Sequence, residues 1–150
     1  MKKSFTLEKI NDDNIKYYQE YEIRYETHLK EFQSRIYPKH EAFRICWYHI
    51  KYEWNYIGSV WLEKINEKDD SAVLGIFIAF DEFRSMGIGS QAISEIISKD
   101  MDSLNVGKII LHVRKGNTRA VSCYKKSGFV ISDEYISPNN ISVYEMTFEK

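Results

Sequence analysis

The chain has 150 residues, a net charge of −1 and 43% hydrophobic residues, which is enough for one domain with a sizeable core. Its lysines and arginines are scattered, so no basic footprint for nucleic acid is present, and no apolar run could span a membrane. The start Met1-Lys2-Lys3-Ser4 lacks the apolar segment of a signal peptide, and Cys46 and Cys123 are too few for a disulfide framework. We therefore expect a single domain, residues 1–150, in the cytoplasm.

The first part of the chain predicts a strand followed by helical structure. Phe5-Thr6-Leu7-Glu8 alternates between apolar and polar residues, and Asp12-Asp13-Asn14 supplies helix caps. Apolar residues then recur at helical spacing before Pro38, which predicts an amphipathic helix or a broken helix pair: Tyr18, Tyr21, Tyr25, Leu29, Phe32 and Ile36. We expect this stripe to belong to the core.

Three strands are predicted next. Residues 42–52 and 56–62 favour two strands around a turn at Glu53-Trp54-Asn55. A polar loop at residues 66–70 separates them from the apolar run Val73 to Phe80, which predicts a third strand.

The segment that follows, Arg84-Ser85-Met86-Gly87-Ile88-Gly89, lies between this strand and a helical pattern that begins at Ser90. Two glycines separated by one residue let the backbone approach a ligand closely. The next helix offers unpaired N–H groups and the positive end of its dipole. The segment therefore predicts an anion-binding loop with a diphosphate as its natural ligand.

Two nucleotide-binding alternatives fit less well. A nucleotide-hydrolase P-loop would need a lysine after its last glycine, but Ser90-Gln91 follows Gly89. Gly87-x-Gly89-x-x-Ala92 satisfies a relaxed dinucleotide fingerprint, and Arg114 could meet a ribose phosphate. However, a polar stretch separates the strand from the glycines, and few residues remain for a second mononucleotide-binding half, so this reading is the runner-up.

Regular elements continue to the end of the chain. A helical face is predicted by the apolar residues Ile88, Ala92, Ile93, Ile96, Ile97, Met101 and Leu104, with Asn105-Val106-Gly107 as its end. Lys108 to Arg114 predicts a buried strand with Ile109, Leu111 and Val113 on one face and Ile110, His112 and Arg114 on the other. Gly116-Asn117-Thr118 then predicts a turn with a cap, Arg119 to Lys126 a helix ended by Ser127-Gly128, and Phe129 to Tyr135 and Ile141 to Phe148 two last strands.

Two of these segments resemble motifs of the GNAT superfamily of N-acetyltransferases. Arg84-x-x-Gly87-x-Gly89 is similar to its (Gln/Arg)-x-x-Gly-x-(Gly/Ala) signature, and the stretch from Asn117 to Phe129 is similar to its second motif, with Asn, Ala, Tyr and Gly-Phe at matching offsets. The resemblance extends from about Val73 to Val130. It departs from many members at Ser85, where they carry Gly, and at Asp81, where they carry Pro.

The resemblance implies an α/β (α+β) fold with a mixed, mostly antiparallel sheet of about seven strands. The expected order is β-α-α-β-β-β-α-β-α-β-β, with helices on both faces and splayed central strands. It also implies acetyl-coenzyme A as co-substrate, no metal, and direct attack of a primary amine on the thioester in a ternary complex. The acceptor would be a small-molecule amine or a peptide or protein amino group, and the chain would be a monomer or a homodimer.

Site residues carry over by position. The implied cofactor-binding residues are Phe77, Ile78, Ala79, Arg84, Ser85, Met86, Gly87, Ile88, Gly89, Ser90, Asn117, Ala120, Tyr124 and Lys126. The backbone of Ile78 and Ala79 would pair with pantetheine like an added strand, and the Ala79 N–H would polarise the thioester carbonyl. Tyr124 would be the general acid that protonates the departing thiolate. For an arbitrary tyrosine at this spacing, packing on the helix's buried face would be the simpler role, but the place of Tyr124 within the Asn117 to Phe129 motif favours the general acid.

The general base stays open among Glu63, His49, His112, Glu134 and ordered water. His112 lies on the central strand, where a histidine is more often a packed, hydrogen-bonded core residue. Cys123 is interpreted as a small buried helix residue rather than as a nucleophile. The polar edge of the first helical segment is interpreted as a solvated face rather than as a surface that attracts a cationic amine. It includes Glu22, Glu26 and Glu31.

Two other functions remain open. The same fold could serve as a non-catalytic module that binds acyl-coenzyme A, in which case Tyr124 would have no role in turnover. The dinucleotide fingerprint leaves an NADP-dependent reductase as the less favoured function.

Overall fold

A computed structural model describes residues 5–22, 38–39, 41–84 and 86–150. Several residues singled out in the sequence lie outside this description: Tyr25, Glu26, Leu29, Glu31, Phe32 and Ile36 of the predicted first helices, and Ser85 of the glycine loop. The second of the two possible helices before Pro38 is therefore not part of the fold described below.

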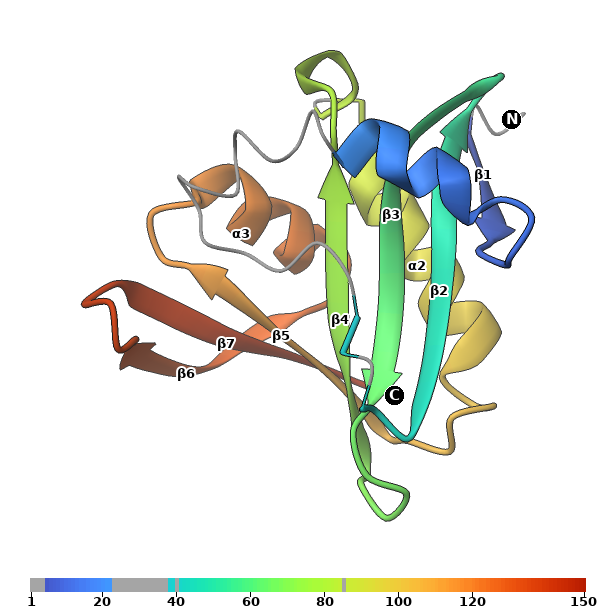
Figure 1. Cartoon of the computed structure of the whole chain (residues 1–150). Helices are drawn as coiled ribbons and strands as arrows, with labels where there is room; N and C mark the ends of the chain where they lie inside the picture. Colours follow the sequence, from blue (N-terminus) through green and yellow to red (C-terminus); the bar gives the residue numbers. More distant parts are fainter. Residues whose placement is uncertain (1–4, 23–37, 40, 85) are drawn as a thin grey trace.

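A seven-stranded sheet organises the molecule, with strand order β1-β2-β3-β4-β5-β7-β6 (Figure 1). All neighbouring strands are antiparallel except β4 and β5, which are parallel. The strands are β1 (Phe5–Lys9), β2 (Arg44–Tyr52), β3 (Asn55–Lys64), β4 (Ser71–Ile78), β5 (Lys108–Arg114), β6 (Val130–Ile136) and β7 (Ser142–Glu149). The predicted mixed, mostly antiparallel sheet is confirmed. A doubly wound dinucleotide fold needs a mostly parallel sheet, so that alternative is wrong.

Helices cover both faces of the sheet, as predicted. Residues 15–22 form a helix that crosses the ends of β2, β3 and β4 on one face (Figure 1, blue). The helices α2 (Ile88–Asp100) and α3 (Thr118–Lys126) lie on the other face, and a 3-10 segment, η1 (Asp81–Phe83), follows β4. Within the described part of the chain, no helix is long and apolar enough to cross a bilayer.

Strand alternation divides the core between these two layers. Val60 and Leu62 of β3 join the large cluster beneath α2, whereas Trp61 between them joins a smaller cluster with Tyr18 and Tyr21 of the first helix. Successive side chains of a strand point to opposite faces, so one strand can serve both layers. Each face of the sheet is therefore anchored to its own helices.

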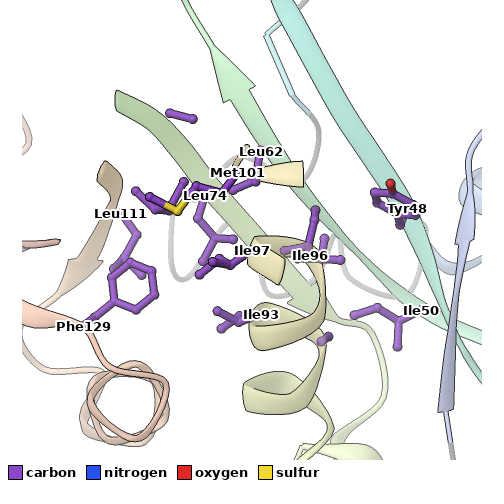
Figure 2. Close-up of a cluster of buried hydrophobic side chains, with 14 of the residues drawn as sticks. Tyr48, Ile50, Leu62, Leu74, Ile93, Ile96, Ile97, Met101, Leu111 and Phe129 are labelled. Atoms are coloured by element: carbon purple, nitrogen blue, oxygen red, sulfur yellow. The ribbon is translucent and has the colours of Figure 1, made fainter. Parts of the chain in front are cut away.

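The large cluster places α2 against the centre of the sheet (Figure 2). Ile93, Ile96 and Ile97 project from α2 toward the strands, as the helical spacing predicted. The helix starts at Ile88, earlier than the predicted Ser90, and ends at Asp100, before Met101 and Leu104. Both later residues remain buried in the turn that follows, because the chain can leave helical geometry without leaving the core.

β4 is paired over a longer stretch at its edge with β3 than at its edge with β5. Six residue pairs join β4 to β3, from Gly58↔Ile78 to Glu63↔Val73. Only three pairs join β4 to β5, and the last is Val73↔Ile110. Beyond that pair the two strands diverge (Figure 1). The predicted splay of the central strands is confirmed, and it leaves one edge of β4 open from Leu74 onward.

Candidate active site

The open edge of β4 presents main-chain groups from alternate residues. The Ala79 N–H donates to the Ile57 carbonyl of β3 at 2.7 Å. Because backbone groups alternate between the two edges of a strand, those of Ile76 and Ile78 point to the opposite, open edge. The Arg84 side chain agrees with this direction, since its Nε and Nη2 donate to the Ile78 carbonyl at 3.1 and 2.9 Å.

This arrangement corrects the role expected for Ala79. Its N–H is committed to the pairing with β3 and is turned away from the gap, so it is not available to polarise a thioester there. The sequence located the correct end of the strand but not the direction of each amide. The Ile78 N–H is the neighbouring donor that faces the gap.

The glycine loop ends in an uncapped helix N-terminus. Gly87 is the N-cap of α2 in the left-handed conformation, with φ of 77°, and no side chain caps the helix or places an acidic group in its first turn. The N–H groups of Ile88, Gly89 and Ser90 have no partner within the helix by geometry. Met86 is half exposed beside them. Such an end favours a bound anion, as the loop predicted.

Gly89 lies where the loop, β4 and α3 meet. A Cβ at this position would be 3.5 Å from Cys123 Sγ and 4.0 Å from Ile78 Cδ1. The two motifs, which are separated in sequence by most of α2 and all of β5, are thus brought together beside the open edge of β4. Ala120 and Cys123 of α3 pack against the large core cluster there.

The residues of the second motif have visible structural roles. The Asn117 Oδ1 accepts the Ala120 N–H at 3.3 Å and caps α3. Tyr124 is half-buried and packs against the core, with its ring centroid 6.3 Å from that of Phe129. Lys126 is exposed at the end of α3. Packing and capping therefore explain part of the motif.

Trp61 and Gly75 shape the other face of β4, and no local sequence pattern predicted their contact. A Cβ on Gly75 would lie only 2.0 Å from the Trp61 indole, so the ring lies directly over the glycine. Trp61 is 2% exposed, and its Nε1 is buried without a hydrogen-bond partner. Extending the register of β4 and β5 past Val73↔Ile110 places Gly75 level with His112.

His49 is excluded as a direct base by its hydrogen bonds. It is fully buried on β2, where its Nε2 lies 2.9 Å from the Asn14 carbonyl and its Nδ1 lies 2.6 Å from the Tyr21 hydroxyl. A carbonyl only accepts, so Nε2 carries the proton and Tyr21 donates to Nδ1. Burial lowers the pKa of His49. The ring is neutral and fully engaged.

Two carboxylates lie too far from the gap to act as the general base. Glu63 is buried at the end of β3 that pairs with Val73, where β4 and β5 are still together, and it accepts the Lys39 N–H at 2.6 Å. Glu134 lies on the edge strand β6 and pairs with Lys115 at 2.7 Å. Neither reaches the gap at Ile78.

His112 differs from what a central-strand position suggests. It is exposed rather than packed in the core, because β5 buries Ile109, Leu111 and Val113 on its other face. Its Nδ1 lies 3.1 Å from the Tyr135 hydroxyl. Of the four residues considered as a base, His112 is the one at the level where the strands separate.

Both thiols have raised pKa values. Burial raises the pKa of Cys123, with Lys126 acting in the opposite direction, and burial together with Asp100 raises the pKa of Cys46 to about 11. The thiolate is the nucleophilic form of cysteine. The environment of Cys123 thus favours the predicted packing role over covalent catalysis.

Comparisons with known proteins give one family and one fold. The acetyltransferase (GNAT) family model matches residues 7–129. Spermidine N-acetyltransferase from Vibrio cholerae, solved with CoA and spermine, has a TM-score of 0.76 and 21% identity over 97% of this chain and 95% of that one. Aminoglycoside acetyltransferase AAC(6′)-Ib, solved with coenzyme A and kanamycin, has a TM-score of 0.73 and 19% identity over 98% and 95%. No curated protein sequence gives a match.

Proposed function

The chain belongs to the acetyltransferase (GNAT) family and is an acetyl-coenzyme A-dependent N-acetyltransferase, and we propose that it acetylates a primary amine that enters the gap between β4 and β5. One observation carries this proposal: the open edge of β4 lies beside the uncapped N-terminus of α2. A hydrogen-bonding edge and an anion site next to each other suit a ligand with an amide-bearing arm and a diphosphate.

The residues around the gap fit coenzyme A in this way. The backbone amides from Gly87 to Ser90 would hold the pyrophosphate, because several N–H groups and the helix dipole meet its charge together. The main chain of Ile76 would pair with the pantetheine amides like an added strand. Arg84 keeps the loop against the end of β4 through its bonds to Ile78. Asn117, Ala120 and Lys126 would border the cofactor from α3.

Acetyl transfer then assigns one task to each polar group at the gap. The co-substrate supplies an acetyl group activated as a thioester, which the amine attacks directly. The Ile78 N–H would donate to the carbonyl oxygen as negative charge develops on it. Tyr124, on α3 beside the same gap, would donate a proton to the departing thiolate, and His112 would take a proton from the incoming ammonium.

The experiment that tests this function combines binding and turnover. Calorimetry should detect the binding of acetyl-coenzyme A and of coenzyme A to the purified protein. In a turnover assay with acetyl-coenzyme A, at least some members of a panel of primary amines should cause the release of free coenzyme A. Protein that binds neither form at millimolar concentration would contradict the proposal. Binding without release for any amine would instead support the non-catalytic module.

The role of His112 has its own test with a matched control. His112→Gln should lower kcat/KM for the amine about tenfold or more and flatten the acid side of its pH profile, because the base is lost. His49→Gln should leave that profile unchanged, since His49 is buried with both nitrogens bonded inside the protein. An unchanged profile in His112→Gln would leave ordered water as the base.

A further inference from the structure

A concave site lies at the C-terminal end of β4, on the side of β3. The helix of residues 15–22, the turn between β2 and β3, and η1 enclose a pocket of about 700 Å³. Its described lining includes Tyr17, Glu20, Tyr21, Trp54, Tyr56 and Glu82. This volume falls within the range of small-molecule sites. The cofactor residues named above do not line it.

The lining combines carboxylates with aromatic rings. Glu20 and Glu82 are the charged groups among the described lining residues, both are exposed, and no cation lines the pocket with them. An anion would be repelled there. Carboxylates and aromatic faces together attract organic cations, so the chemistry of the pocket selects an alkylammonium.

Part of the aromatic lining is already used by lysines. Tyr17 and Tyr56 stack with centroids 4.2 Å apart, and the ammonium groups of Lys16 and Lys51 lie 5.2 and 4.9 Å from these two centroids. Glu8 offsets Lys51 at 3.3 Å. A ligand cation therefore has the rings outside this stack to contact, and Trp54 is the most accessible of them.

Two features prepare the pocket for a ligand. Trp54 is 90% exposed at the turn between β2 and β3, so the face of its ring is accessible to a ligand. Tyr21 is held rigidly, because its hydroxyl donates to the buried His49 and its ring packs 5.6 Å from that of Phe77. One wall is fixed, and the opposite rim carries a free aromatic face.

The pocket and the gap lie on the two sides of one strand end. Ile57 and Phe80 line the pocket and flank Ala79, whereas the gap begins on the other edge of β4. Neighbouring strands are about 4.8 Å apart, so the two sites are separated by the width of a single strand. A short aliphatic chain can span that separation.

We propose that the acceptor is an aliphatic amine with at least two amino groups, and that this pocket holds its distal ammonium while the reacting amine lies in the gap. The inference rests on the proposed function and specifies its substrate class. Glu20 and Glu82 neutralise the distal charge, and Trp54 covers it. A monoamine lacks this second anchor and binds only through its reacting end.

The kinetic test compares 1,6-diaminohexane with n-hexylamine. Glu20→Gln and Glu82→Gln should each reduce kcat/KM for the diamine about fivefold, with little change for the monoamine. Glu67→Gln, at an exposed turn remote from the pocket, removes the same charge and should change neither. Acetyl-coenzyme A affinity should be unchanged in Glu20→Gln. Equal losses for both amines would overturn the proposal, because the effect would then be general electrostatic attraction.

A binding experiment separates this inference from the proposed function. The diamine should quench the fluorescence of Trp54 and bind by calorimetry, and Trp54→Ala and Glu20→Gln should weaken that binding several-fold. If amines are acetylated with no preference for diamines, the inference fails and the function stands. If no amine at all is acetylated, the function fails. Diamine that binds but is not acetylated would also overturn the inference, since the pocket would then hold a cation other than the acceptor.

Discussion

The two edges of β4 differ although they belong to the same eight residues. Toward β3 the strand is paired from Val73 to Ile78, and Ala79 adds one more hydrogen bond. Toward β5 the pairing stops at Val73. The closed edge thus uses its backbone groups within the sheet. On the open edge the Ile78 carbonyl accepts hydrogen bonds from Arg84, and the remaining groups of Ile76 and Ile78 lie outside the sheet.

The chain connections explain this difference. β3 and β4 are joined by a short loop and run antiparallel, so both stay in register along the pair. β5 reaches β4 only after α2 and then pairs along its whole length with β7. β5 stays paired with β7 and turns away from β4. The helix α3 packs beside the opening that results. We expect changes on the closed side to alter stability and changes on the open side to alter function.

The largest effect is expected on the open side, at Tyr124. Tyr124→Phe should lower kcat about 100-fold or more, because the thiolate would leave without a positioned proton donor. The ring still packs against Phe129, so the free energy of unfolding and the affinity for acetyl-coenzyme A should change little. Steady-state kinetics, calorimetry and urea unfolding measure the three quantities. If the loss in unfolding free energy were as large as the loss in transition-state stabilisation calculated from kcat, Tyr124 would have a packing role alone.

The closed side should respond through stability, at Gly75. Gly75→Ala places a Cβ 2.0 Å from the buried Trp61 ring, so the indole or the strand must shift. We expect a loss of about 2 kcal/mol in unfolding free energy, roughly 30-fold in the unfolding equilibrium. Gly116→Ala is the control, since nothing lies within 4 Å of its Cβ. An equal effect of both variants on urea unfolding would contradict this account.

Gly87 and Gly89 sharpen the comparison within the open side. Gly87 has a positive φ of 77°, so Gly87→Ala strains the loop and should weaken acetyl-coenzyme A binding about tenfold, as measured by calorimetry. At Gly89 a Cβ makes only ordinary contacts with Cys123 and Ile78. Gly89→Ala should therefore be tolerated better than Gly87→Ala. The reverse order would mean that space, rather than backbone conformation, determines the shape of the anion site.

Much of this fold follows from local patterns. The apolar spacing of Ile93, Ile96 and Ile97 predicted the buried face of α2, and the alternation from Lys108 to Arg114 predicted β5 with its correct faces. Hydrophobic periodicity is a local signal, so it transfers directly from sequence to element. The resemblance of two segments to motifs of one family, rather than a local pattern, implied that both would border the same cofactor.

What the sequence did not predict depends on pairing between strands. The direction of the Ala79 N–H follows from its register with Ile57, and the contact of Trp61 with Gly75 follows from their cross-strand position. The exposure of His112 depends on which face of β5 the helices cover. Register joins residues that are distant in sequence, so no local pattern contains it.

The smallest effect is expected at His49, on the closed side. Burial lowers its pKa below the ordinary 6.5, so the unfolded chain takes up a proton at this site more readily than the folded protein. The stabilising contribution is therefore present above pH 6.5 and is lost as the pH falls through the folded-state pKa. Burial raises the pKa of Glu8, but hydrogen bonds with Tyr56, Lys51 and Asn14 outweigh burial, so the net pKa is lowered. The contribution of Glu8 to stability therefore changes only below its ordinary pKa of 4.5.

The measurement compares urea unfolding of the wild type and His49→Gln at about pH 7.5 and about pH 5.5. The wild type should lose more stability on acidification than the variant, because only the wild type must charge a buried imidazole. Its Nδ1 would then lose the hydrogen bond from Tyr21, which loosens the first helix from the sheet. If both proteins lose the same stability, His49 does not couple pH to the closed side, and the contrast between the two edges of β4 would rest on Gly75 alone.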